Sequence, residues 1–163
     1  MLMGRLLAQA AAAEDKFVTW IPAYGAEVRG GTAFCMVVIS DEEIASPFAN
    51  EPTACIAMNE PSLKKYEGKI KKNGLLIVNS SLAKIKPSRV DLRALCIPCT
   101  DIATQIGNIK VANMVALAAY LEKSKIVKVE TLKQVLKQEA IANKKEALLA
   151  VNEQAIAEGA RYA

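Results

Sequence analysis

The sequence predicts a three-layer α/β/α domain with a Rossmann-like, mostly parallel sheet and a helical C-terminal extension. Short apolar runs of strand length alternate with helical patterns over the first two thirds of the chain, as they do in βα units. The runs are almost continuously apolar, which is typical of strands covered on both faces. Helical patterns dominate the last third. We therefore expect a single domain over residues 1–163, with an α/β core at 1–107 and C-terminal helices at 108–163.

Composition narrows the class of protein. The chain has 163 residues, of which 52% are hydrophobic and 23% charged, a balance typical of a folded globular domain. Its net charge of +4 is spread along the chain and accompanies only 5% aromatic residues, which argues against nucleic-acid binding. The apolar run at 111–121 is too short to cross a bilayer, and residues 1–13 lack the basic start of a signal peptide. We expect a cytoplasmic protein with no nucleic-acid or membrane partner.

Histidine is absent from the sequence. Its absence excludes Ser–His and Cys–His nucleophile pairs, histidine metal ligands and the commonest general base. The neighbouring acids at 14–15 and 41–43 have no recognisable partner. We therefore assign no catalytic residue and no metal ligand.

The N-terminal third predicts one helix and two strands. Residues 1–13 place leucine and alanine on one helical face, although no capping residue and no strand come before them. Residues 16–21 form a short β-prone stretch, and residues 22–32 form a loop region with three glycines. Residues 33–40 are an apolar run that suits a strand of a largely parallel sheet.

The middle of the chain continues the alternation. Residues 53–58, 75–78 and 92–98 predict three further strands. A helix is expected at 59–70, with Pro61 near its first turn. A turn is expected at Asn73-Gly74.

The remaining segments predict helices. A short one is expected at 100–107, followed by one at 110–123 that is apolar on nearly every side and is therefore buried or lies in a subunit interface. Two more are expected at 130–140 and 144–158, with Gly159 as a C-terminal stop.

Two motifs outside the glycine-rich loop region are candidate sites. Cys96 and Cys99 have the spacing of half a zinc site, of iron–sulfur ligands or of a redox pair. Their only possible partners, Cys35 and Cys55, fall in apolar strands, so we favour ordinary free thiols. The lysines at 64, 65, 69, 71 and 72 fit either an acidic or phosphate-bearing partner or, as we favour, a solvated helix face.

The loop region at 22–32 has more glycines and functional side chains than a plain surface turn needs. Gly25, Gly30 and Gly31 permit backbone conformations and close approaches that other residues resist. Arg29 sets a planar, permanently charged guanidinium beside the paired glycines, with Glu27 close enough to orient it and Tyr24 supplying a ring and a hydroxyl. Exposed backbone N–H groups in such a segment suit a phosphate, a carboxylate or a tightly packed second chain.

At this segment the chain resembles the gamma subunit of 2-oxoacid:ferredoxin oxidoreductases. The segment at 22–32 is similar to that family's signature, and further matches keep the family's order and spacing almost to the end of the chain: 39–41, 44–47, 59–62, 78–80, 106–108, 111–114, Asn152, Ala155 and Gly159. The sequence of residues 24–32 is followed by a strand that carries a cysteine. This combination is more similar to the 2-oxoglutarate and branched-chain types than to the pyruvate type.

The resemblance implies a function for the whole complex. Such enzymes convert a 2-oxoacid and coenzyme A (CoA) to acyl-CoA and carbon dioxide and pass electrons to ferredoxin. It implies that thiamine diphosphate and iron–sulfur clusters lie in partner subunits, the alpha, beta and ferredoxin-like delta chains. The gamma chain packs on these partners and helps bind CoA. We expect the isolated chain to be inactive, since it carries neither a Gly-Asp-Gly motif for thiamine diphosphate nor a cluster-binding cysteine array.

The resemblance also implies which residues face the ligand or the partner. Tyr24, Gly25, Glu27, Arg29, Gly30 and Gly31 are expected to form the loop on the CoA side. Four polar positions at expected strand or helix ends are further candidates: Asn79, Ser80, Asn108 and Asn113.

One departure and two alternatives accompany this interpretation. Family members begin with a strand and a Gly-x-Gly-Gly-Gln-Gly loop, whereas this sequence begins at the following helix, so we expect the fold to lack both. The first alternative is a stand-alone α/β module that binds a nucleotide or CoA through residues 29–31. The second is the gamma-like domain of an aryl-pyruvate ferredoxin oxidoreductase.

Overall fold

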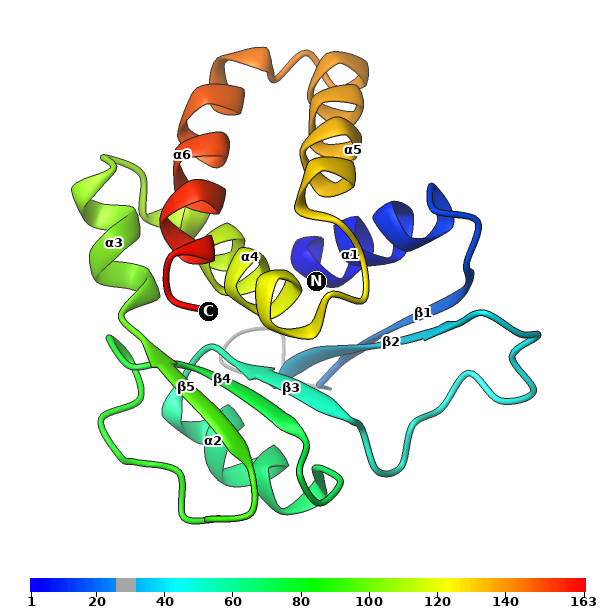
Figure 1. Cartoon of the computed structure of the whole chain (residues 1–163). Coiled ribbons are helices and arrows are strands. Elements are labelled where there is room, and N and C mark those ends of the chain that lie inside the picture. The colour runs from blue at the N-terminus through cyan, green and yellow to red at the C-terminus, as the bar shows by residue number, and fades with distance from the viewer. Residues whose placement is uncertain (26–31) are drawn as a thin grey trace.

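The computed structural model describes residues 1–25 and 32–163, and it confirms the α/β fold class (Figure 1). The strands are β1 (Phe17–Tyr24), β2 (Ala33–Ser40), β3 (Ala54–Ala57), β4 (Leu75–Asn79) and β5 (Arg93–Ile97). The helices are α1 (Leu2–Ala12), α2 (Glu60–Tyr66), α3 (Cys99–Gln105), α4 (Ala112–Ser124), α5 (Val129–Ala142) and α6 (Leu149–Ala160). Short 3₁₀ turns lie at Glu67–Lys69, Ile109–Val111 and Glu146–Leu148.

The strands form two sheets rather than one. β3, β4 and β5 are parallel and in sequence order, with Ala54 opposite Leu75 and Leu75 opposite Arg93. β1 and β2 form a separate antiparallel hairpin, with Phe17 opposite Ser40 and Tyr24 opposite Ala33. A cavity of about 290 Å³ lies where the two sheets adjoin, lined on one side by β2 and on the other by the start of β3. Within the part of the chain that the structure describes, no strand pairs with the outer edge of β2 or of β3.

The hairpin corrects two sequence expectations. Residues 22–24 continue β1 instead of opening a loop, because the edge of a two-stranded sheet tolerates Pro22. Residues 33–40 form a strand as expected, but that strand is antiparallel to its neighbour and only half-buried. A parallel return needs a crossover of roughly a dozen residues or more, and the segment between the two strands is shorter than that.

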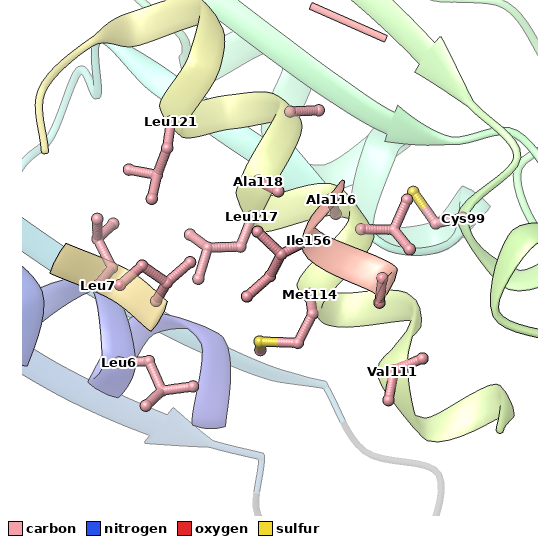
Figure 2. Packing of buried hydrophobic residues seen from close by; sticks show 14 of the residues in the cluster. Leu6, Leu7, Cys99, Val111, Met114, Ala116, Leu117, Ala118, Leu121 and Ile156 are labelled. Atoms are coloured by element: carbon pink, nitrogen blue, oxygen red, sulfur yellow. The ribbon is translucent and has the colours of Figure 1, made fainter. Parts of the chain in front are cut away.

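The larger hydrophobic core lies on the face of the parallel sheet that α4 covers. α4 is buried almost all round, as its sequence predicts, and packs between the sheet, α1 and α6. Figure 2 shows side chains of three helices in this core: Leu6 and Leu7 of α1, Leu117 of α4 and Ile156 of α6. Burial of so many large apolar side chains is the dominant favourable term in folding.

Gly159 is placed differently from its sequence expectation. It is the next-to-last residue of α6, so the helix ends one residue beyond it, and it is buried. A Cβ built there would lie 2.2 Å from the carbonyl oxygen of Val115 in α4. The glycine therefore lets the two helix backbones approach, which is a packing role and not a capping role.

The opposite face of the sheet carries a much thinner layer. It consists of α2 and the ends of the loop at 80–92, over a small cluster of buried side chains: Ala57, Leu63, Ile70, Leu76, Val78, Ala83 and Leu92. Asn59 begins α2 as expected of an N-cap residue, because its side chain accepts a hydrogen bond from the Ser62 N–H at 2.9 Å.

α1 ties the hairpin to the helical layer. A Cβ on Gly4 would lie 2.4 Å from the Sγ of Cys35, so only glycine lets α1 sit this closely on β2. After α1, the Glu14 carboxylate accepts hydrogen bonds from the Lys128 N–H at 2.8 Å and the Thr131 hydroxyl at 2.6 Å. Glu14 thus satisfies the free N-terminal N–H of α5 from a distant part of the chain.

Candidate functional site

The β1–β2 hairpin holds the ends of the glycine-rich segment at its tip. Tyr24 is the last residue of β1, and its side chain is exposed. The Gly25 N–H donates to the Thr32 carbonyl oxygen at 2.8 Å and closes the two strands. Four of the predicted site residues, Glu27, Arg29, Gly30 and Gly31, lie outside the described residues. The hairpin therefore presents Tyr24 and Gly25 at one end of the segment and Thr32 at the other.

The lysine-bearing helix α2 lies beside this tip. The Nζ of Lys65 is 3.4 Å from the Thr32 hydroxyl oxygen. The ring of Tyr66 packs against Phe34 of β2, with centroids 5.3 Å apart and a tilt of 50°. These contacts join two segments that are more than thirty residues apart in the sequence, so no local pattern predicts them.

Two ammonium groups flank the Tyr66 ring. The Nζ atoms of Lys65 and Lys69 lie 5.5 and 5.7 Å from its centroid, within the range of a cation–π interaction. Lys64, by contrast, pairs with Glu60 at 2.7 Å one helical turn away. All five lysines are exposed, as a solvated face requires, but that interpretation did not separate Lys65 and Lys69 from Lys64. The four-residue spacing of Lys65 and Lys69 around an aromatic residue is the signal that could have found this difference.

Asn79 organises the carboxyl ends of the parallel strands. It is fully buried at the end of β4, where its amide nitrogen donates to the Met58 carbonyl oxygen at 3.2 Å and to the Thr100 hydroxyl at 2.9 Å. Its oxygen accepts from the N–H groups of Ser81 and Thr100, each at 3.3 Å. One side chain thus joins the ends of all three strands, and each of its polar atoms has a protein partner. The geometry gives Asn79 a positioning role at this edge.

The remaining predicted positions are dispersed. Ser80 is half-buried, and its N–H donates to the Ile97 carbonyl oxygen at 2.9 Å. Asn108 caps the 3₁₀ turn that leads into α4, because its side-chain oxygen accepts from the Lys110 N–H at 3.1 Å. Asn113 lies half-buried in the first turn of α4. Among the residues that the structure describes, no hydrogen bond or ion pair connects these three to Tyr24 or Gly25.

The cysteines are free thiols in unlike surroundings, and all four lie in the described residues. Burial raises the pKa of Cys99 to about 12 and the pKa of Cys55 to about 11. Since the thiolate is the nucleophile and the metal ligand, burial disfavours both roles for these two. Cys96 is exposed on β5, so the Cys96–Cys99 pair is split between the surface and the core. Over residues 1–25 and 32–163, no three cysteine, aspartate or glutamate side chains are grouped as metal ligands would be.

No helix among the described residues is both long and apolar enough to cross a bilayer.

Together, the sheet, its helical layers and the hairpin tip define an α/β domain that displays a basic and aromatic surface. Residues 1–162 match the family model described as pyruvate ferredoxin/flavodoxin oxidoreductase. The chain belongs to this family, which confirms the resemblance stated on sequence motifs.

Curated relatives of two lengths match the chain. It is 38% identical over 119 residues to the ketoisovalerate oxidoreductase subunit VorA of Methanothermobacter marburgensis, covering 73% of this chain but only 25% of that protein. It is 34% identical over 139 residues to the 2-oxoglutarate synthase subunit KorC of Methanocaldococcus jannaschii, covering 83% of this chain and 74% of that protein. The chain therefore spans about a quarter of the VorA relative and about three quarters of the KorC relative.

Solved structures share the fold. The gamma subunit of a keto/oxoacid ferredoxin oxidoreductase from Geobacter sulfurreducens superposes with a TM-score of 0.83 at 27% identity, covering 99% of this chain and 89% of that chain. A 2-oxoglutarate:ferredoxin oxidoreductase from Magnetococcus marinus, solved with 2-oxoglutarate, coenzyme A and succinyl-CoA bound, superposes with a TM-score of 0.87 at 25% identity. It covers 99% of this chain and 28% of that longer chain.

Proposed function

We propose that this chain is the gamma component of a cytoplasmic 2-oxoacid:ferredoxin oxidoreductase, which converts a 2-oxoacid and CoA to acyl-CoA, carbon dioxide and reduced ferredoxin. The observation that carries the proposal is the match to the family along residues 1–162. The chain supplies packing against the alpha, beta and delta subunits and part of the CoA site. Thiamine diphosphate and the iron–sulfur clusters belong to those partners and supply the carbanion and electron-transfer chemistry there.

The surface beside the hairpin tip supports a CoA-binding role. CoA carries phosphate groups, an adenine ring and a long polar arm. The ammonium groups of Lys65 and Lys69 and the Thr32 hydroxyl are donors that suit phosphate oxygens. The exposed ring of Tyr24 is available for stacking on a flat base. We propose that these residues hold the ligand and that Glu27, Arg29, Gly30 and Gly31 complete the site.

The polar residues at strand and helix ends have a different part in this proposal. Asn79 keeps the carboxyl ends of β3, β4 and β5 in register through its four hydrogen bonds. Ser80, Asn108 and Asn113 line the approach to the partner subunits. Ligands of open α/β sheets collect at this edge, which is why these positions remain in the proposed site.

Reconstitution tests the function. The chain is mixed with its cognate subunits, and CoA-dependent reduction of ferredoxin or a viologen is measured with pyruvate, 2-oxoglutarate and 2-oxoisovalerate in turn. We expect full activity only when this chain is present. A complex that assembles and turns over normally without it would contradict the proposal.

Substitution of Lys65 and Lys69 tests the CoA site. In the reconstituted complex, Lys65→Ala combined with Lys69→Ala should raise the KM for CoA about ten-fold or more, as expected for loss of two charge-assisted contacts. The KM for the 2-oxoacid should stay unchanged. Lys133→Ala and Lys137→Ala on α5 form the matched control, since they remove the same charge far along the chain. An unchanged KM for CoA in the first variant would show that Lys65 and Lys69 do not bind CoA.

The two match lengths bear on the organisation of the complex. The same domain occurs in a gamma subunit of similar length and within longer chains such as VorA. The aryl-pyruvate alternative, which places the domain in a fused chain, therefore remains a second candidate, and the 2-oxoacid that supports turnover separates the two. Calorimetry of the isolated chain with CoA tests the stand-alone module, which predicts tight binding without any partner.

A further inference from the structure

One strand of the parallel sheet is left uncovered on the α2 side. In the ladder between β4 and β5, Ala94 lies opposite Leu76 and Cys96 lies opposite Val78. Leu76 and Val78 belong to the buried cluster beneath α2, so Ala94 and Cys96 point to the same face of the sheet. Yet both are exposed, because among the described residues α2 packs over β3 and β4 and not over β5.

The loop between β4 and β5 borders this bare strand and carries exposed apolar side chains. It starts on the α2 side, where Ala83 is buried, and returns there at Leu92. Leu82, Ile85 and Val90 of this loop are exposed, and Val90 is exposed completely. We call Leu82, Ile85, Val90, Ala94 and Cys96 the β5 surface. Exposed apolar side chains near one another often mark an interaction site.

The exposure of Val90 is built into the loop. The buried carboxylate of Glu67 accepts hydrogen bonds from the Ser88 N–H at 2.6 Å and the Arg89 N–H at 2.8 Å. The Arg89 guanidinium in turn donates to the carbonyl oxygens of Glu67 and Ile70, at 3.1 and 2.5 Å, and binds the Asp91 carboxylate. Side chains on both sides of Val90 are therefore fixed, and Val90 is held outward. A preorganised contact loses little conformational entropy on binding.

The charges around the β5 surface are mainly positive. Lys84 and Lys86 are exposed in its loop, whereas Asp91 is paired with Arg89. Asp101, at the start of α3, is the exposed acid nearby in the sequence. An apolar centre with a cationic rim complements a partner that presents apolar side chains surrounded by carboxylates.

We propose that the β5 surface is the docking face for another subunit of the complex, one whose contacting surface is apolar with an acidic rim. The inference rests on the proposed function. The small side chains of Ala94 and Cys96 let a partner backbone approach the strand closely, and Val90 inserts as the apolar anchor. Docking at the β5 surface leaves Lys65 and Lys69, beside Tyr66 at the hairpin tip, accessible to CoA.

Cys96 provides a direct test. It is the exposed cysteine, whereas Cys55 and Cys99 have raised pKa values and Cys35 is half-buried under α1. The free chain and the assembled complex are treated with a maleimide, and mass spectrometry follows the rate at each cysteine. We expect alkylation of Cys96 to slow about ten-fold or more on assembly, as burial in a specific interface requires. An unchanged rate in an intact complex would overturn the docking face but leave the proposed function standing. Failure of the chain to form any complex with its cognate subunits would contradict both the docking face and the proposed function.

Two substitutions add an independent measurement. Val90→Ser should weaken subunit association about ten-fold, since it removes the proposed anchor, and Lys86→Glu should weaken it several-fold and make it less salt-dependent. Lys137→Glu on α5 is the matched charge control and should leave association unchanged. Thermal melting of each isolated chain verifies folding. Equal association of all three variants, or protection of Cys96 by self-association of the chain alone, would contradict the proposal.

Discussion

The two faces of the parallel sheet are built very differently. On one face, α4 is buried beneath α1, α5 and α6, and the buried side chains form one large continuous cluster. On the other face, the two-turn helix α2 and the ends of one loop cover a small cluster and leave β5 bare. The thick face therefore supplies most of the apolar burial that stabilises the fold. The thin face carries the features proposed to act on other molecules, namely the lysines of α2 and the β5 surface.

The largest loss of stability is expected on the thick face, where the backbones of α4 and α6 approach most closely. Gly159→Val places a Cβ at 2.2 Å from the Val115 carbonyl oxygen, which forces α4 and α6 apart. We expect a loss of about 4 kcal/mol or more in the free energy of unfolding, measured with urea, because backbone atoms cannot yield as side chains do.

Gly68 on the thin face is the matched glycine. A Cβ built there meets no atom within 4 Å. Gly68→Ala should change the free energy of unfolding by no more than about 0.5 kcal/mol, as for other surface substitutions. Similar losses at Gly68 and Gly159 would show that the two faces are equally constrained, contrary to their packing.

Truncation of leucines compares the two hydrophobic clusters directly. Leu117 and Leu63 are both fully buried, the first under α1 and α6 and the second under α2 alone. Leu117→Ala should cost about 3–4 kcal/mol and Leu63→Ala about 2 kcal/mol, because a thin layer relaxes more readily around a cavity. Chemical denaturation with CD or tryptophan fluorescence gives both values. A larger loss at Leu63 would reverse the ranking of the two faces.

Removing the carboxylate of Glu67 should loosen the loop on the thin face. Glu67→Ala leaves the N–H groups of Ser88 and Arg89 without their acceptor, and we expect a loss of about 2 kcal/mol in the free energy of unfolding. Hydrogen exchange should quicken at residues 86–91 and stay unchanged in α4. Glu67→Gln, which keeps one acceptor oxygen, should lose less. Unaltered exchange in the loop would show that other contacts hold Val90 outward.

The smallest effect concerns Glu14 and is pH-dependent. Partial burial opposes ionisation of its carboxyl, but hydrogen bonds from Thr131 and the Lys128 N–H outweigh burial and hold its pKa below the usual 4.5. A lowered native pKa stabilises the fold above the unfolded value, and this stabilisation is lost as pH falls through the native value. Glu14→Gln should cost about 1 kcal/mol at neutral pH and almost nothing in strong acid. If the difference in the free energy of unfolding between the two proteins did not change with pH, the charge of Glu14 would not contribute to this cap.

Much of the fold follows from the amino-acid sequence, because local patterns carry it. The strands at 54–57, 75–79 and 93–97 appear as apolar runs, and the all-round apolar pattern of 112–124 predicts its burial. The glycine–arginine pattern at 24–31 indicates a functional segment without any tertiary information. The family resemblance was carried by short motifs in fixed order and is confirmed over residues 1–162.

The remaining features depend on contacts between segments far apart in the chain. Whether 33–40 joins the parallel sheet or a hairpin is decided by what pairs with it, since an apolar run is compatible with both. A glycine is typical of a helix end, but the close approach of α4 gives Gly159 a packing role. Lys65 differs from Lys64 only because Thr32 and Tyr66 lie beside it.

The sequence by itself therefore determined the α/β class, the buried helix and the family of this protein, since periodicity and motif order are local properties. The tertiary structure alone decided which face of the sheet is thick, which cysteine is exposed and which lysines adjoin the hairpin tip. Those properties depend on the distance between segments, and the folded chain sets that distance by burying its apolar faces against one another.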